Sequence, residues 1–168
     1  ETLEGYLKQH PRDTQAVALL ASAHMSQGRP ARAAQLMQGA LQVQDTPNTR
    51  TALGLSLVGA SRHADALPEF EAAFRKDPGQ VQAGSALVFL YMQARQPAKA
   101  QAVIQVMLKS SPDHAGVQNL SGMVKLATGD ATGARAAFER SVKADAAFVA
   151  PQLNLARMDA GKGDLDGA

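Results

Sequence analysis

The sequence lacks cysteine and tryptophan, and only 4% of its residues are aromatic. Without cysteine it forms no disulfides and no thiolate metal sites, although this absence does not indicate a compartment. No apolar run approaches the roughly 18 residues that a membrane span needs. Strand-forming residues are scattered and never alternate over a sustained run, so a β-sheet is not expected.

Strong charge of either sign is also lacking. The chain of 168 residues has 17 Lys and Arg against 15 Asp and Glu. Neither half is strongly basic, which argues against nucleic acid or an anionic membrane as the partner. Alanine is abundant instead, and it favours helices because its side chain loses no entropy on entering one. The composition therefore predicts an all-α protein.

The organising feature of the chain is a period of about 34 residues. Five alanines are separated by 33, 34, 34 and 34 residues, namely Ala33, Ala66, Ala100, Ala134 and Ala168. A proline column and a glycine column follow the same grid, with Pro11, Pro78 and Pro112 in one and Gly28, Gly129 and Gly163 in the other. A period of this length with two helices per unit is typical of tetratricopeptide repeats.

The whole chain resembles the tetratricopeptide family, most clearly in the unit 47–80, which has Leu53, Gly54, Leu57, Ala66, Phe70, Ala73 and Pro78 in the family pattern. The resemblance implies an all-α, right-handed α-solenoid of antiparallel helix pairs. We predict about ten helices in one array, 1–168. Residues 1–13 form the second helix of a truncated unit, whole units follow at 14–46, 47–80, 81–114 and 115–148, and 149–168 is a partial unit. This division predicts a piece of a longer array, whose exposed ends could pair two copies.

Each column of the repeat has a physical reason. The first helix carries a small residue where two helices approach closely, at Ala21, Gly54, Val88, Gly122 and Ala156. The second helix carries a large apolar residue that fills the space between units, at Leu3, Met37, Phe70, Ile104 and Phe138. The glycine column suits left-handed helix ends, with Asp130 and Asp164 placed to cap the helices that follow. Pro30 and Pro97 begin second helices, whereas Pro68 predicts a kink or a late helix start.

No constellation for catalysis or for metal or cofactor binding is present. The four histidines have no partner at a convincing metal-ligand spacing, and His24 occupies a packing position. Asp159, Asp164 and Asp166 lack the further ligands of a calcium loop. No Gly-x-Ser-x-Gly motif accompanies the serines. We therefore predict no cofactor and no enzymatic activity, unless a catalytic domain lies elsewhere in a longer protein.

The family resemblance implies a concave groove built from the first helices, which binds a protein or peptide segment. In the family, this groove is lined by the second, fifth, ninth, twelfth and thirteenth residues of each unit. Our partner-binding candidates at these positions are Met25, Asn48, Thr51, Leu55, Val58, Gln82, Ser85, Phe89, Met92, Asn119, Met123 and Leu126. The four whole units have no Lys or Arg there, which argues against a carboxylate clamp. The groove is expected to take an apolar or helical segment, although some of these side chains could instead pack within the array.

A narrower resemblance lies in the stretch 144–159, ADAAFVAPQLNLARMD. It is similar to the repeats of the tetratricopeptide lipoproteins associated with bacterial exosortase (PEP-CTERM) sorting and exopolysaccharide export. This resemblance implies a scaffold in cell-envelope assembly, export or protein sorting, located in the periplasm or cell envelope. Two alternatives stay open: a cytoplasmic adaptor of the same fold, and a regulatory module fused to an enzyme. A lipobox in the full-length protein would favour the first reading, and a catalytic domain the last.

Overall fold

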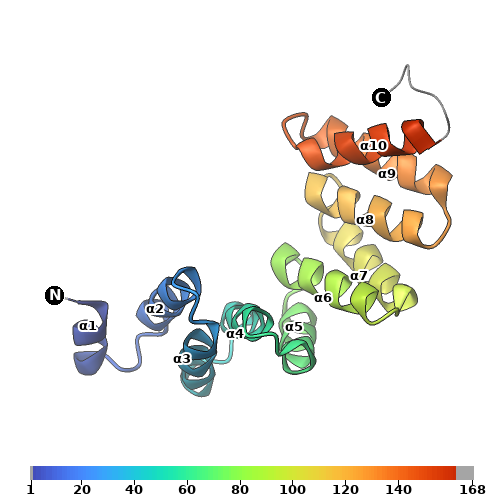
Figure 1. Ribbon diagram of the computed structural model, residues 1–168. Helices are drawn as coiled ribbons and strands as arrows, with labels where there is room; N and C mark the ends of the chain where they lie inside the picture. Colours follow the sequence, from blue (N-terminus) through green and yellow to red (C-terminus); the bar gives the residue numbers. More distant parts are fainter. Residues whose placement is uncertain (1, 162–168) are drawn as a thin grey trace. The chain divides into compact units, whose positions relative to one another are not determined.

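The computed structural model describes residues 2–161, and this part of the chain is helical throughout, with no strand (Figure 1). Its helices are α1 (Leu3–Gln9), α2 (Thr14–Ser26), α3 (Pro30–Val43), α4 (Pro47–Gly59), α5 (His63–Lys76), α6 (Val81–Gln93), α7 (Pro97–Ser110), α8 (Ala115–Ala127), α9 (Ala131–Ala144) and α10 (Val149–Gly161). The predicted fold class, an all-α helical solenoid, is confirmed. Ala168, Gly163, Asp164 and Asp166 lie outside the described residues.

The chain forms two compact units, Glu1–Ala83 and Gly84–Ala168. In the first unit each helix from α1 to α4 packs against the next one, and α2 also contacts α4. In the second unit α7 packs on α8, α8 on α9, and α9 on α10. The contact between α2 and α4 brings two first helices of successive repeats side by side, and this places the candidate site described below.

The helix starts follow from local chemistry. Pro30, Pro47 and Pro97 each stand at the first position of a helix, where the missing N–H has no intrahelical partner to lose. The Asp130 carboxylate caps α9 by accepting from the Gly133 N–H at 2.8 Å, as the sequence predicts. Asp13 caps α2 in the same way, accepting from the Ala16 N–H at 2.9 Å.

The first helices end in one repeated turn. Gly28 and Gly129 have positive φ values of 71° and 86°, as expected for their column. Ser61 and Arg95 stand in the same column and adopt φ of 59° and 55° without glycine's freedom. At all four turns the next residue's N–H reaches back to a carbonyl five residues earlier, as from Arg29 to His24 at 2.8 Å. These bonds satisfy carbonyls that the helix end leaves open, so the turn persists where glycine is absent.

The core is made by the columns that the period identifies. The four alanines of the second helices within the described range, Ala33, Ala66, Ala100 and Ala134, are fully buried. Phe70 and Phe138 are also 0% exposed. Each ring lies against a glycine of the small column: a Cβ built on Gly54 would stand 2.7 Å from Phe70 Cε1, and one on Gly122 would stand 2.4 Å from Phe138 Cε1. At Gly54 and Gly122, the absence of a side chain therefore leaves the space that these rings occupy.

Pro68 departs from one sequence-based expectation. The helix α5 begins at His63 and continues through Pro68 to Lys76, so of the two predicted alternatives, a kink or a late helix start, the late start is wrong. Ala66, Phe70 and Ala73, on both sides of the proline, are completely buried. Their packing holds α5 helical where a proline in an isolated helix would cost roughly 3 kcal/mol.

Candidate functional site

The candidate site lies on the paired first helices of the Glu1–Ala83 unit, where a pocket of ≈ 520 Å³ opens between α2 and α4. Six of its nine lining residues are groove positions that the family resemblance implied, namely Ala18, Ser22, Met25, Leu55, Val58 and Gly59. Met25, Leu55 and Val58 form its apolar walls and are partly exposed. A void of roughly 150 Å³ already accommodates benzene, so this pocket has room for a bulky apolar side chain.

Small residues also line this pocket. Ala21 and Ala52, which we call its floor, occur among the lining residues together with the larger apolar walls. Gly59, the last residue of α4, allows the Met25 side chain to lie across its backbone. A Cβ built on Gly59 would stand 2.8 Å from Met25 Cε and 3.1 Å from Pro30 Cβ. The width of the pocket at this end therefore depends on one glycine.

A second, polar pocket of ≈ 330 Å³ continues from the first one, and Ala18 lines both. Its polar lining consists of hydroxyls and carboxamides from Thr14, Gln15, Gln44, Thr46, Asn48 and Thr49. The Thr14 hydroxyl donates to Gln44 Oε1 at 3.0 Å, and Gln80 Nε2 donates to Asn48 Oδ1 at 2.6 Å. These bonds orient the two exposed carboxamides, and in the described part of the chain the other end of each carries no hydrogen bond.

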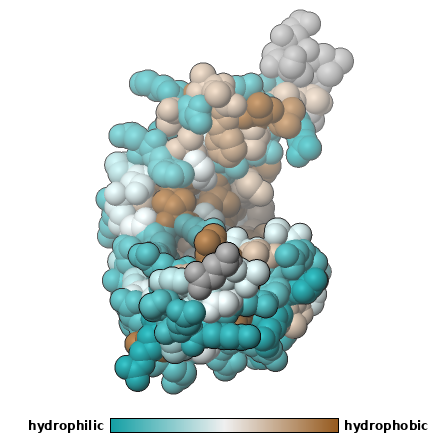
Figure 2. All heavy atoms as spheres, turned by 90° about the vertical axis from the view of Figure 1, so that its left-hand side faces the viewer, coloured by the Kyte–Doolittle hydropathy of each residue, from teal (hydrophilic) through white to brown (hydrophobic). Residues whose placement is uncertain are grey.

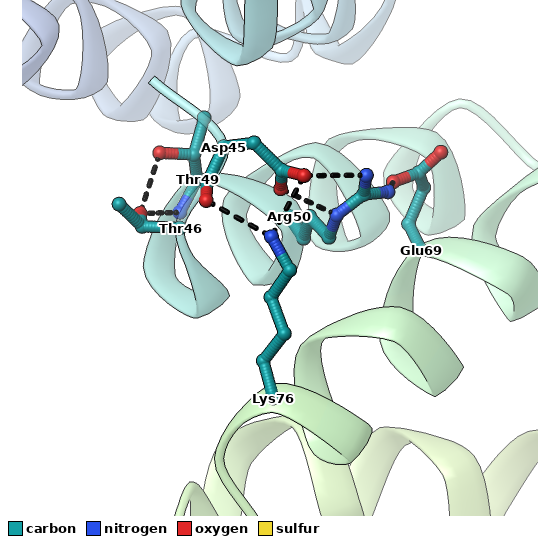
Figure 3. A network of polar contacts seen from close by, with 6 residues as sticks. All are labelled: Asp45, Thr46, Thr49, Arg50, Glu69 and Lys76. Carbon is teal, nitrogen blue, oxygen red and sulfur yellow. Dashed lines mark hydrogen bonds and ion pairs between the residues drawn. The ribbon is translucent and has the colours of Figure 1, made fainter.

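No charged side chain lines either pocket. Asp45 and Arg50, which adjoin lining residues in the sequence, belong to an ion network beside the polar pocket (Figure 3), whereas Asp13, which precedes Thr14, caps α2. Arg50 Nε lies 2.6 Å from Asp45 Oδ1 and Arg50 Nη1 lies 2.7 Å from Glu69 Oε2, while Lys76 Nζ lies 2.7 Å from Asp45 Oδ2. The hydrogen bonds from Arg50 and then from Lys76 lower the pKa of Asp45 from 3.8 to about 2. The four charges of this network pair with one another, and the residues that line both pockets are uncharged.

The twelve sequence-predicted groove residues differ widely in exposure. Thr51 and Asn119 are buried, at 3% and 7% exposure. The Thr51 hydroxyl donates to Gln80 Oε1, and Asn119 Oδ1 accepts from Asn154 Nδ2 at 3.1 Å. Both side chains thus serve the internal hydrogen bonding of the array. Met25, Leu55 and Val58 line the apolar pocket and Asn48 the polar one, whereas Gln82 is exposed and Ser85 partly exposed on α6.

The Gly84–Ala168 unit presents large apolar side chains directly to solvent. Phe89 on α6 is 53% exposed, and Met123 and Leu126 on α8 are 50% and 44% exposed. Met92 is partly exposed. In Figure 2, apolar side chains gather among the C-terminal helices, whereas the front of the N-terminal unit, seen from α1, is mainly hydrophilic. Four predicted groove residues of this unit are therefore accessible to a partner.

The floor and the polar end are the parts of the site that sequence reasoning missed. Ala21, Ala52 and Ser56 line the apolar pocket but fall outside the family's groove positions. Gln44 and Thr46 come from the connection between α3 and α4. Small residues facing one another across α2 and α4 are the signal that could have predicted a pocket, because they leave space between larger neighbours.

Two further searches of residues 2–161 bear on the kind of site. They contain no cluster of three or more His, Cys, Asp or Glu side chains with the geometry to hold a metal ion. None of the helices in this range has the length and apolar character to cross a membrane.

Comparison with known proteins identifies the repeat. Two family models, both described as tetratricopeptide repeat, match residues 1–48 and 57–123. No curated protein sequence matches the chain. Among solved structures, MamA (from residue 41) of Desulfovibrio magneticus RS-1 is 16% identical with a TM-score of 0.75, over 91% of this chain and 87% of that one.

Two further solved structures are similar to the chain. PilW, described as a widely conserved type IV pilus biogenesis factor, is 19% identical with a TM-score of 0.83, over 99% of this chain and 78% of that one. YrrB, described as a TPR protein with an unusual peptide-binding site, is 13% identical with a TM-score of 0.72, over 90% and 79%. At these identities the likeness shows a shared fold.

Proposed function

Because the chain is built of tetratricopeptide repeats, we propose that it is a non-enzymatic scaffold that holds a segment of another protein against its first helices. Repeat arrays of this kind use extended surfaces to bind partners. The observation that carries the proposal is the ≈ 520 Å³ pocket between α2 and α4. Its apolar walls are residues of the groove that the family uses for binding.

The contact we propose is apolar rather than electrostatic. Neither pocket on α2 and α4 has a charged lining residue, so the site has no cationic side chain to clamp a carboxylate. The second unit also offers apolar contact, because it exposes the side chains of Phe89, Met123 and Leu126 to a partner. Burying one such side chain is worth roughly 1.5–3 kcal/mol, and a few apolar anchors can dominate a binding free energy.

We further propose that the scaffold works in the bacterial cell envelope, in assembly, export or protein sorting. Two observations support this proposal. The stretch 144–159 is similar to the repeats of PEP-CTERM-associated lipoproteins, and the fold is shared with the pilus biogenesis factor PilW. Fractionation of cells that produce the full-length protein tests it, because recovery in the cytosol alone would contradict an envelope role.

The scaffold proposal is tested by site-specific photo-crosslinking in the cells that encode the protein. A photoreactive residue replaces Leu55 in the pocket, and a matched one replaces Leu19, which is 63% exposed on α2 outside both pockets. We expect a discrete crosslinked protein from position 55 and a much weaker one from position 19. Equal products from both positions, or none from position 55, would contradict a partner in this groove.

A further inference from the structure

The paired pockets on α2 and α4 narrow the chemistry of what they can bind. Because every lining residue is uncharged, a charged group on the ligand would lose hydration there without gaining a counter-charge. The occupant that complements this surface is itself uncharged where it makes contact. The walls of Met25, Leu55 and Val58 require an apolar side chain at that end.

The polar pocket adds a second requirement. Gln44 and Asn48 are each held by one hydrogen bond within the unit and keep the other end of the carboxamide for a ligand. The free end of each carboxamide is the NH2 group, which donates hydrogen bonds and can therefore pair with the C=O groups of a peptide main chain. Asn48 and Leu55 are two turns apart on α4, so these two lining residues are about 10 Å apart along the helix axis at 1.5 Å per residue. An extended peptide covers this distance in about three residues.

Gly59 limits the size of the apolar ligand side chain that the pocket can admit. Met25 Cε would lie 2.8 Å from a Cβ at this position, which is closer than real contacts allow. An alanine there would therefore push the flexible Met25 side chain into the pocket that it now borders. The same Cβ would also stand 3.1 Å from Pro30 Cβ, so an alanine would be crowded by a second and less flexible neighbour.

We propose that the α2–α4 surface binds an uncharged, extended peptide segment with one bulky apolar anchor, that Gly59 and Met25 set the size limit for this anchor, and that the main chain about three residues away pairs with Asn48 and Gln44. This inference rests on the proposed scaffold function and specifies its partner. The Gly59 backbone is thus a specificity-determining position, although it contributes no side chain to the contact.

The test is selection of random peptides displayed on phage against the full chain, followed by titration of the enriched peptides. The Gly59→Ala variant is compared with Gly39→Ala in α3, where a Cβ meets nothing within 4 Å. We expect enriched peptides that share a bulky apolar residue and have few charges. Their affinity should fall roughly tenfold or more in Gly59→Ala, the order that overpacking a site produces, and stay unchanged in Gly39→Ala.

A second variant keeps the test informative if Gly59→Ala perturbs folding. Met25→Ala enlarges the pocket and should shift the selection toward peptides with larger apolar anchors. Circular dichroism checks that this variant keeps the helical content and melting temperature of the parent chain. Enriched peptides that bind both glycine variants equally, or that are predominantly charged, would overturn the inference and leave the scaffold function standing. Failure of the parent chain to enrich any peptide would instead contradict the scaffold function itself.

Discussion

At the scale of single residues, packing in both units depends on a glycine facing a buried phenylalanine ring. Gly54 faces Phe70 in one unit and Gly122 faces Phe138 in the other. The rings are fully enclosed, so they have nowhere to move if the glycine gains a side chain. A close-packed interior transmits such a change as strain rather than absorbing it.

We expect Gly122→Ala to lower the free energy of unfolding by about 1–3 kcal/mol, because its Cβ would meet Phe138 Cε1 at 2.4 Å. Gly39→Ala is the matched control, since a Cβ there has open space, and it should raise stability by up to about 1 kcal/mol through helix propensity. Urea unfolding of both variants checks this. A Gly122→Ala variant as stable as the control would contradict the proposed role of the small column.

His24 offers a stabilising change at the same scale. It is 8% exposed, and its Nδ1 atom has no hydrogen-bond partner within the described residues. A buried polar atom without a partner costs roughly 1–3 kcal/mol. We therefore expect His24→Leu to raise the urea midpoint without changing helical content. A lower midpoint would mean that the imidazole makes a contribution to packing that outweighs its unsatisfied nitrogen.

At the scale of elements, the fourth position of three repeats links each of them to the preceding repeat through an ion pair or a hydrogen bond. In these units the fourth residue reaches back to the residue in the proline column of the unit before it. Arg50 pairs with the Asp45 carboxylate, Gln118 donates to the Pro112 carbonyl at 2.6 Å, and Gln152 donates to the Ala146 carbonyl at 2.7 Å. These three units form the link with different residue types, whereas Val17 and Gly84, at the same position of the other two units, have no polar side chain to form it.

The Asp45 network makes the free energy of unfolding of the first unit depend on pH between about 2 and 4. The pKa of Asp45 is about 2 in the folded chain and returns toward 3.8 on unfolding. Its stabilising contribution is therefore complete above pH 3.8 and disappears as the pH falls toward 2. We expect the free energy of unfolding to fall more across this window in the parent chain than in Asp45→Asn. Equal pH dependence of the two chains would show that the network does not stabilise the folded state.

The helices of the described residues follow the period of about 34 residues that the sequence shows, because the alanine column and the glycine column depend on packing that recurs along the chain. Ser61 and Arg95 even take the left-handed turn that glycine takes elsewhere. The start of α5 was not predictable from Pro68, because burial of Phe70 and its neighbours outweighs a local penalty. Local rules describe single helices, whereas these outcomes depend on contacts between them.

The candidate site was predictable only in outline. Family positions indicate Met25, Leu55 and Val58, which do line a pocket. They do not distinguish exposed from buried polar positions, so Thr51 and Asn119 could not be separated from Asn48 before the structure. Each of those two buried side chains makes a hydrogen bond to a residue outside its own helix, Gln80 for Thr51 and Asn154 for Asn119. The family positions of one helix do not identify such partners.

At the scale of the whole molecule, each unit offers its own apolar surface, and the two can be tested separately. Phe89 and Met92 are accessible on α6, so the double change Phe89→Ala, Met92→Ala should leave the melting temperature nearly unchanged. If the second unit contributes to binding, affinity for the crosslinked partner should fall tenfold or more, equivalent to about 1.4 kcal/mol. Unchanged affinity in the folded double variant would confine binding to the first unit.

We propose that an apolar groove with uncharged lining residues on the first helices binds the partner. A calorimetric titration of the crosslinked partner, or of a selected peptide, at low and high salt tests this binding. The parent is compared with Leu55→Asp in the groove and with Leu19→Asp outside it. The account predicts strong loss of binding only in Leu55→Asp, and little salt dependence in the parent. Binding that survives Leu55→Asp in the folded variant, or that modest salt abolishes in the parent, would contradict it.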